Sequence, residues 1–197
     1  MTCLVGIRVP GVGAVIMAEG QITDESGRIW TKRANKLLKL PEVVIGVCGY
    51  YSILDVIAAS KVKTYDDVKA FIFNTSAAHA YQLLCYDRRR DRLVAIESDG
   101  QETVHNNWVT EGAGADLAAG ALAALPRSES MEQAVVRARA AVTIACRMQV
   151  TCGGAIHYFQ SKAIRGSKKN ATTRSKAHVK KPPSTSNKRL SVRRPSF

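Results

Sequence analysis

Residues 2–23 read TCLVGIRVPGVGAVIMAEGQIT, and this stretch decides the fold of the chain. The β-branched run Cys3–Val9 predicts a strand, Pro10-Gly11 predicts a turn, and Ala14–Ala18 predicts a second strand. Because the first run is almost entirely apolar, we expect its strand to be buried. Thr2 therefore opens a buried strand at the very start of the sequence.

The following sequence predicts strands and helices in blocks. The expected elements are strands at Arg28–Thr31, Lys36–Leu40 and Val43–Cys48, helices at Ile53–Lys61 and Thr64–Cys85, strands at Arg92–Ser98 and Gln101–Val109, helices at Asp116–Leu125 and Ser128–Ala145, and a strand at Gly154–Phe159. The first two strands of this series should pair with each other, and Asp99-Gly100 should turn a hairpin. Blocks of this kind are typical of stacked antiparallel sheets covered by helices and not of an alternating βαβ fold.

Charge is distributed unevenly along the 197 residues, whose formal net charge is +13. Residues 161–197 hold twelve Lys or Arg and no Asp or Glu, which leaves 17 basic and 16 acidic residues in 1–160. The tail also has few apolar residues, so burial cannot offset the entropy lost on ordering it. We therefore predict a nearly neutral domain over 1–160 and a disordered basic tail over 161–197. The whole chain is not a basic nucleic-acid-binding fold.

The cysteines, histidines and apolar runs indicate a cytoplasmic protein without a cofactor. The five cysteines are odd in number and scattered, no C-x-x-C occurs, and the four histidines lack the spacing of metal ligands. Buried, reduced thiols and no metal site are expected. The sequence has no signal peptide and no apolar run long enough to span a bilayer, so we expect no membrane association.

Thr2 carries the most distinctive chemistry in the sequence. Removal of Met1 gives Thr2 a free α-amine beside its own hydroxyl, and such an amine has an unperturbed pKa of about 7.7–8.0. The amine can take the proton of the hydroxyl, directly or through a water, and the oxygen can then attack a carbonyl. A Thr at this position usually means only that Met1 is easily trimmed, so Thr2 alone does not establish an enzyme.

Four segments within residues 2–49 point to a known family by their order: Thr2–Arg8, Val15–Thr23, Arg33–Leu40 and Val44–Gly49. Their succession resembles the start of a proteasome β-type subunit, and in particular the HslV peptidase, which are N-terminal nucleophile (Ntn) hydrolases. The family pattern is an N-terminal Thr strand, M-A-x-D-x-Q-x-T, N-x-x-K-x-x-x-L and a G-x-x-G strand end. The resemblance implies an α+β fold, a four-layer αββα sandwich, over residues 2–160.

The resemblance also implies four catalytic residues. Thr2 matches the nucleophile, Lys36 the lysine that holds down the pKa of the hydroxyl and the α-amine, and Glu19 an Asp that pairs with this lysine. Gly49 matches the glycine whose backbone N–H faces the oxyanion. Lys36, Glu19 and Gly49 also have ordinary explanations: a surface lysine, a solvated strand end and a glycine in a turn, respectively.

The sequence departs from the family pattern in its supporting residues. The acid is Glu19 instead of Asp, and it follows Ala18 directly, without the usual residue in between. Ala113 replaces a loop serine. Gln149 stands where proteasome subunits carry an Asp, although HslV-type chains lack this Asp as well. Tyr50-Tyr51 replaces small residues after the oxyanion glycine and should narrow or reshape the substrate pocket. The nucleophile, the lysine and the glycine are retained.

Two functional hypotheses follow. The first is a threonine peptidase that cleaves unfolded polypeptides; the resemblance implies a homo-oligomeric ring and an AAA+ ATPase partner that delivers substrate. The second is an inactive or weakly active scaffold with the same fold, whose basic tail binds nucleic acid or an acidic partner. Twelve positive charges would favour binding to a phosphate backbone, while the lack of Trp and Tyr in the tail argues against base stacking. A merely solubilising or assembly tail is the other interpretation.

Overall fold

The computed structural model describes residues 2–24, 26–50, 52–75 and 80–164. Its elements, in chain order, are β1 (Leu4–Val9), β2 (Gly13–Glu19), β3 (Ile22–Thr23), β4 (Ile29–Thr31), β5 (Leu37–Lys39), β6 (Val43–Gly49), α1 (Ile53–Ala59), α2 (Tyr65–Asn74), β7 (Tyr81–Asp87), β8 (Arg92–Glu97), β9 (Glu102–His105), β10 (Trp108–Glu111), α3 (Ala115–Ala124), α4 (Met131–Met148) and β11 (Ile156–Lys162).

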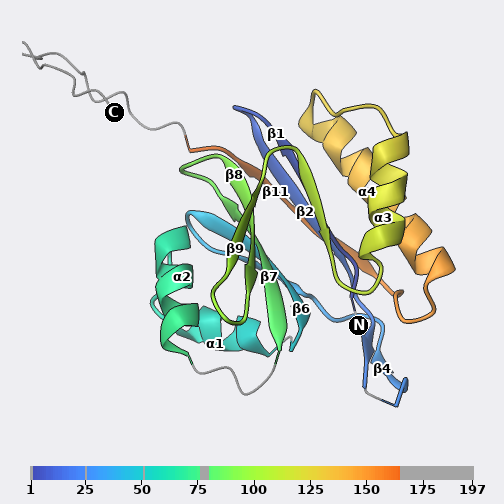
Figure 1. Cartoon of the computed structure of the whole chain (residues 1–197), viewed down its shortest axis with the longest axis horizontal. Helices are drawn as coiled ribbons and strands as arrows, with labels where there is room; N and C mark the ends of the chain where they lie inside the picture. The colour runs from blue at the N-terminus through green and yellow to red at the C-terminus, as the bar shows by residue number, and fades with distance from the viewer. Residues whose placement is uncertain (1, 25, 51, 76–79, 165–197) are drawn as a thin grey trace, which may run out of the picture. The chain divides into compact units, whose positions relative to one another are not determined.

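Two antiparallel sheets form the centre of the domain (Figure 1). The first sheet has the order β10-β1-β2-β11, and the second has the order β5-β6-β7-β8-β9. The short strands β3 and β4 pair only with each other among the described residues. Because β1 and β2 are the central strands of the first sheet, the start of the chain is held by neighbours on both sides.

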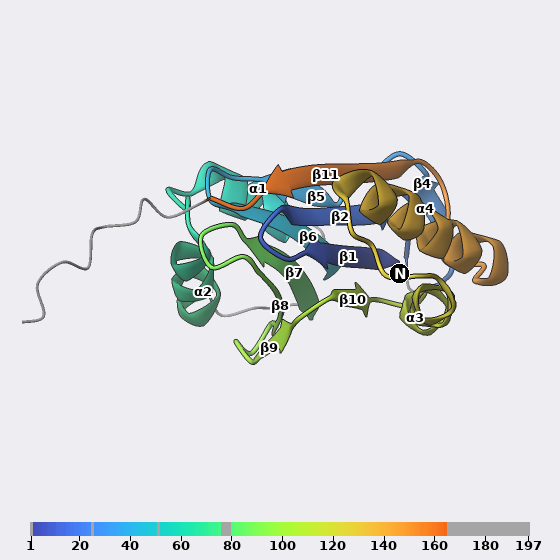
Figure 2. The ribbon, with the colours of Figure 1, turned by 90° about the horizontal axis from the view of Figure 1, so that it is seen from above.

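The domain has four layers, two of helices and two of sheet, and three hydrophobic clusters fill the spaces between them (Figure 2). One lies between the first sheet and helices α3 and α4, and a second lies between the second sheet and helices α1 and α2. The third fills the space between the two sheets and includes Leu4, Ile16, Leu84 and Leu93. Burying each such side chain contributes about 1.5–3 kcal/mol. The predicted αββα sandwich is therefore confirmed.

The predicted helix from Thr64 to Cys85 is wrong in its second half. Helix α2 begins after a Thr64 cap, as expected, but it ends at Asn74, and the sequence from Tyr81 forms strand β7. This strand lies in the middle of the second sheet and is buried on both faces, with Leu83 against the helices and Leu84 against the other sheet. A strand that is apolar on both faces has no period of two, so its spacing resembled that of a helix.

The predicted pairing of Arg28–Thr31 with Lys36–Leu40 is also wrong. Strand β4 pairs with β3, whereas β5 pairs with β6 in the second sheet, with Leu37 opposite Gly46. The backbone carbonyl of Lys36 accepts a hydrogen bond from the amide of Val47 at 3.0 Å. This pairing ties Lys36 to the sheet that ends at Gly49.

The predicted strand Gln101–Val109 is divided between the two sheets. Strand β9 ends at His105 in the second sheet, and β10 begins at Trp108 beside β1 in the first. The chain therefore passes from one sheet to the other at Asn106-Asn107 and brings Glu111 opposite Leu4. This crossing delivers the loop after β10 to the start of β1.

The last strand, β11, runs to Lys162, two residues beyond the predicted domain boundary at 160. The predicted tail lies outside the described residues from position 165 onward. No helix in the described part of the chain is long and apolar enough to cross a membrane.

A matched pair of Val→Ala substitutions tests the packing of the second sheet. Val94 is fully buried, whereas Val136 on α4 is 70% exposed. We expect Val94→Ala to lower the free energy of unfolding by about 2 kcal/mol through lost burial and a residual cavity. Val136→Ala should change it by less than about 0.5 kcal/mol, the range of ordinary surface substitutions. Urea unfolding followed by circular dichroism measures both, and equal effects would contradict the assignment of this core.

Candidate active site

Thr2 is fixed at the start of β1 by the loop that follows β10. Its side chain is almost fully buried, and its carbonyl accepts a hydrogen bond from the amide of Gly114 at 3.3 Å. Gly112 has φ +90°, and a Cβ there would come within 2.3 Å of the Thr2 carbonyl oxygen. Only glycine combines this backbone conformation with so close an approach. The loop therefore holds the backbone of Thr2 in place.

Lys36 brings a buried ammonium group to the Thr2 hydroxyl. Its Nζ lies 3.0 Å from Thr2 Oγ1, 2.6 Å from Glu19 Oε1 and 2.6 Å from the carbonyl oxygen of Gln21. The three acceptors match the three N–H donors of an ammonium group, which has no acceptor of its own. With 2% of its surface exposed, Lys36 is not the surface lysine of the ordinary explanation.

Glu19, the last residue of β2, compensates the positive charge of Lys36. Its Oε1 accepts from Lys36 and from the amide of Cys3 at 3.3 Å, while its Oε2 accepts from the amides of Gln21 at 2.6 Å and Gly153 at 3.1 Å. A buried carboxylate is tolerated when it is paired and hydrogen-bonded in this way. Glu19 is fully buried, so it is not a solvated strand end. Its side chain reaches the lysine despite the altered spacing of the motif.

A pocket of about 410 Å³ opens beside the Thr2 hydroxyl. It is lined by Thr2, Cys48, Gly49, Ala80, Tyr81, Gln82, Glu97, Ser98, Gly112 and Ala113. Gly49 ends β6 with φ +84°, and a Cβ there would lie 2.6 Å from the carbonyl oxygen of Ala80. The structure thus brings together Thr2, Lys36, Glu19 and Gly49, which the sequence singled out.

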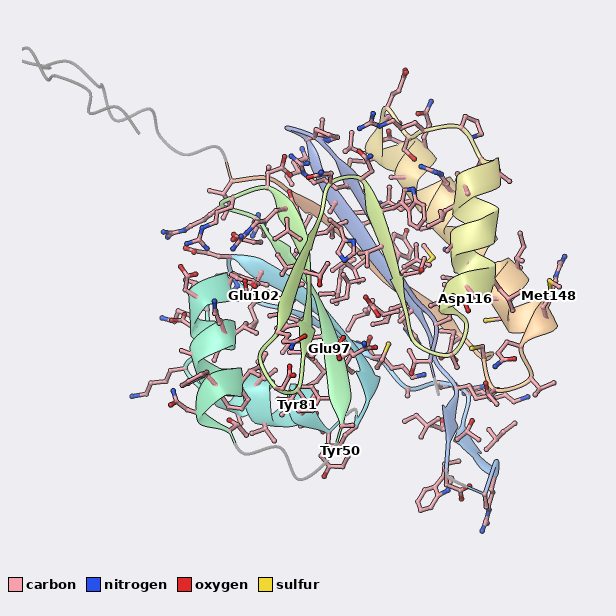
Figure 3. All side chains as sticks on the ribbon, viewed as in Figure 1. Tyr50, Tyr81, Glu97, Glu102, Asp116 and Met148 are labelled. Carbon is pink, nitrogen blue, oxygen red and sulfur yellow. The ribbon has the colours of Figure 1, made fainter. Side chains whose placement is uncertain are left out.

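The residues that depart from the family pattern lie around this centre. Ala113 lines the pocket, and Gln149 follows α4, where its carbonyl accepts from the amide of Cys152 at 3.0 Å. Tyr50 is 44% exposed at the lower edge of the molecule in Figure 3, and the pocket wall is formed by Tyr81 instead. Tyr50 does not line this pocket, and the narrowing or reshaping expected from Tyr50-Tyr51 as a pair stays a prediction. Tyr51 lies outside the described residues.

Several groups at the site were not predicted from the sequence. The carbonyl of Gln21, within the segment Val15–Thr23, and the amide of Gly153 were not identified as partners of the ion pair. Gln82 and Glu97 were also missed, because Gln82 lies on the strand that was predicted as a helix. The sequence did contain a signal for Glu97. Leu93, Ala95 and Glu97 occupy every second position of β8, which predicts that their side chains share one face of the sheet.

Two cysteines flank Thr2 but are poor nucleophiles. Cys3 and Cys48 are buried and form no disulfide, and burial raises the pKa of both thiols far above the ordinary value. The thiolate is the reactive form of cysteine, so both side chains stay neutral and unreactive at physiological pH. Ser98 also lines the pocket, but Thr2 carries the pocket hydroxyl to which the buried Lys36 donates, so Thr2 is the candidate nucleophile.

Solved structures show which fold this arrangement belongs to. The chain is similar to HslV from Trypanosoma brucei, with a TM-score of 0.64 and 18% identity over 81% of this chain and 99% of that one. It is also similar to BPH from Thiobacillus denitrificans, with TM-scores of 0.63 and 12% identity to two structures, one of them in complex with epoxomicin. These matches cover 82% and 83% of this chain and 99% of each BPH chain.

No protein-family model and no curated protein matches the sequence. The chain therefore has the Ntn-hydrolase fold of HslV and of the proteasome-like BPH, at sequence identities of 18% and 12%. The resemblance noted in the sequence is confirmed at the level of the fold.

The ion pair beneath Thr2 makes a quantitative prediction. Replacing Glu19 with Gln removes the charge that compensates the buried ammonium of Lys36. We expect this variant to lose about 3–5 kcal/mol in the free energy of unfolding, the typical effect of breaking a buried pair by removing one partner. The same change at the exposed Glu129 serves as the control and should have an effect of less than about 0.5 kcal/mol. A loss below about 1 kcal/mol for Glu19→Gln in urea unfolding contradicts a charged pair.

Proposed function

We propose that this protein is a threonine peptidase that hydrolyses peptide bonds of unfolded polypeptides from Thr2, once Met1 is removed. One observation carries the proposal: Lys36 Nζ lies 3.0 Å from Thr2 Oγ1 and is itself held by the buried carboxylate of Glu19. An ammonium group at this distance stabilises the negative charge that develops on the oxygen when it becomes a nucleophile.

The α-amine of Thr2 is the base in this proposal. Lys36 donates to Oγ1 and, as an ammonium group, has no lone pair with which to accept the hydroxyl proton. Removal of Met1 creates an amine on the same residue as the hydroxyl, and the adjacent positive charge of Lys36 favours the neutral, proton-accepting form of that amine. Thr2 thus supplies both the nucleophile and the base, and Lys36 positions the oxygen.

The reaction proceeds through an ester. Oγ1 attacks the substrate carbonyl while its proton passes to the α-amine, and the resulting oxyanion is stabilised by the backbone amide of Gly49. The C–N bond then breaks, and the leaving amine takes the proton from the α-ammonium. A water molecule, deprotonated by the α-amine, hydrolyses the ester of Thr2 and regenerates the hydroxyl.

The pocket and the fold support the remaining parts of the proposal. The pocket of about 410 Å³ beside Thr2 supports the binding of a substrate side chain next to the nucleophile. The HslV-like fold supports assembly into a homo-oligomeric ring served by an AAA+ ATPase that unfolds substrates. The five free cysteines support a reducing compartment such as the cytoplasm.

Intact-mass spectrometry combined with epoxomicin labelling tests the nucleophile. We choose epoxomicin because BPH has been solved in complex with it. We expect the purified chain to lack Met1 and to gain the mass of one epoxomicin at Thr2, and we expect Thr2→Ala to gain none. A chain that retains Met1 and stays unlabelled would contradict the peptidase and favour the scaffold.

A second prediction concerns Lys36. Lys36→Met keeps an unbranched side chain but removes the donor to Thr2 Oγ1, so kcat/KM for a peptide substrate should fall roughly 10²–10³-fold, as for loss of one preorganised electrostatic donor. The exposed Lys39 on β5 provides the control, since Lys39→Met leaves the site intact. Circular dichroism of both variants verifies folding. A decrease in kcat/KM of less than tenfold for Lys36→Met would contradict the proposed role of Lys36 as the donor to Thr2 Oγ1.

A further inference from the structure

One carboxylate lines the pocket beside Thr2 and a second lies next to the pocket lining, and the proposed reaction uses neither. Glu97 lines the pocket at the end of β8. Glu111 ends β10 and immediately precedes Gly112, which also lines the pocket. In Figure 3, Glu97 lies well inside the outline of the molecule, whereas Tyr50 lies at its edge.

Strand register places both carboxylates on the inner faces of the sandwich. Cys48 lies opposite Gln82, and Gln82 lies opposite Glu97, so these three side chains share one face of the second sheet. Cys48 belongs to the cluster between the sheets, as does Leu4, which lies opposite Glu111 in the first sheet. Glu97 and Glu111 therefore extend this inner layer at the end of the sandwich where Thr2 lies.

Among the partly or fully buried acids of the described residues, Glu97, Glu111 and Asp24 have no cation, and Asp24 is held by Ser26, Trp30 and the amide of Arg28 instead. The other acids of this group each form an ion pair. Those acids are paired as follows: Glu19 with Lys36, Glu42 with Arg89, Asp87 with Arg90 and Arg92, Asp91 with Arg8, and Glu102 with Lys69. In the described part of the chain, no ion pair involves Glu97 or Glu111. Glu97 Oε1 accepts a hydrogen bond from Gln82 Nε2 at 2.5 Å, which fixes its orientation.

The electrostatics of the pair favour a positively charged ligand. Burial, and then the negative charge of Glu97, raise the pKa of Glu111 above its ordinary value. Two carboxylates that repel each other in a partly buried pocket are both stabilised when a cation enters. The walls formed by Cys48 and Tyr81 offer apolar surface, which suits a side chain with an aliphatic stem and a charged end.

We propose that Glu97 and Glu111 make this pocket selective for a lysine or arginine side chain of the polypeptide that binds beside Thr2. This inference rests on the proposed function, because it names the substrate class of the same site. The cationic chain has two sources with the same chemistry. One is a foreign unfolded polypeptide, and the other is the basic segment 161–197 of a copy of this protein, with its twelve Lys or Arg.

Binding measured without turnover provides the first test. We use full-length Thr2→Ala and two acetylated, amidated ten-residue peptides that differ only in a central lysine or norleucine, which have the same carbon chain. Isothermal titration calorimetry should show at least tenfold tighter binding of the lysine peptide, with a preference that shrinks at high salt. Equal affinity for the two peptides overturns the inference.

Matched variants assign the preference to the two carboxylates. Glu97→Gln/Glu111→Gln, introduced into the Thr2→Ala chain, should reduce the lysine-to-norleucine affinity ratio at least tenfold, whereas Glu129→Gln should leave the ratio unchanged. The ratio should also fall as the pH is lowered through the raised pKa of Glu111, because only the ionised carboxylate attracts the cation. A ratio that is unchanged in the double variant contradicts the assignment.

Labelling separates a failure of this inference from a failure of the proposed function. If epoxomicin labels Thr2 but the two peptides bind equally, the peptidase stands and the cationic preference is refuted. If Thr2 stays unlabelled while the lysine preference and its loss in the double variant persist, the cation pocket stands and the peptidase is refuted.

The intact mass of the wild-type chain during incubation distinguishes the two sources of the cation. Cleavage next to Lys or Arg within residues 161–197, absent from Thr2→Ala, identifies the tail as an occupant. A constant mass, together with tighter binding of the lysine peptide, identifies a foreign polypeptide. The comparison of lysine with norleucine decides the inference in either case.

Discussion

A buried ammonium group under the first residues of the chain organises the rest of the site. Lys36 lies within 3.0 Å of three oxygen atoms, from Thr2, Glu19 and Gln21, and such a charge is stable in the interior only when its partners are fixed. The partners come from the start of β1, the end of β2 and the segment that follows it. The two central strands of the first sheet must therefore keep their register to hold these oxygen atoms around the ammonium group.

The same end of the sandwich holds two kinds of carboxylate. Glu19 is fully buried and accepts hydrogen bonds from three backbone amides and one lysine, so its negative charge interacts only with groups of the protein itself. Glu97 and Glu111 are only partly buried; Glu97 lines the pocket, and Glu111 directly precedes Gly112 of the pocket lining. The site thus combines a positive charge that acts on the nucleophile with negative charges that act on what binds next to it.

Residues 2–49 were the informative part of the sequence because they combine local pattern with fixed order. Thr2, Glu19, Lys36 and Gly49 were all selected from this part, and the structure places them around one centre. Strand β7 was predicted as a helix, because a strand that is buried on both faces shows no alternation. Glu97 and Gln82 were missed with it, since their common face became visible only once β7 was paired with β8.

The sequence by itself predicted that a threonine opens a buried strand, that an acid and a lysine follow in an order resembling the proteasome-like family, and that antiparallel sheets are covered by helices. The resemblance then implied the αββα sandwich. The tertiary structure alone decided that Lys36 is buried against Thr2, because strand β5 pairs with β6 and not with its neighbour β4. It also decided that Glu97 and Glu111 lie close enough for the charge of Glu97 to raise the pKa of Glu111, although they lie on different sheets. Contacts between distant segments depend on strand register and on the crossing between sheets, and a local pattern of residues encodes neither.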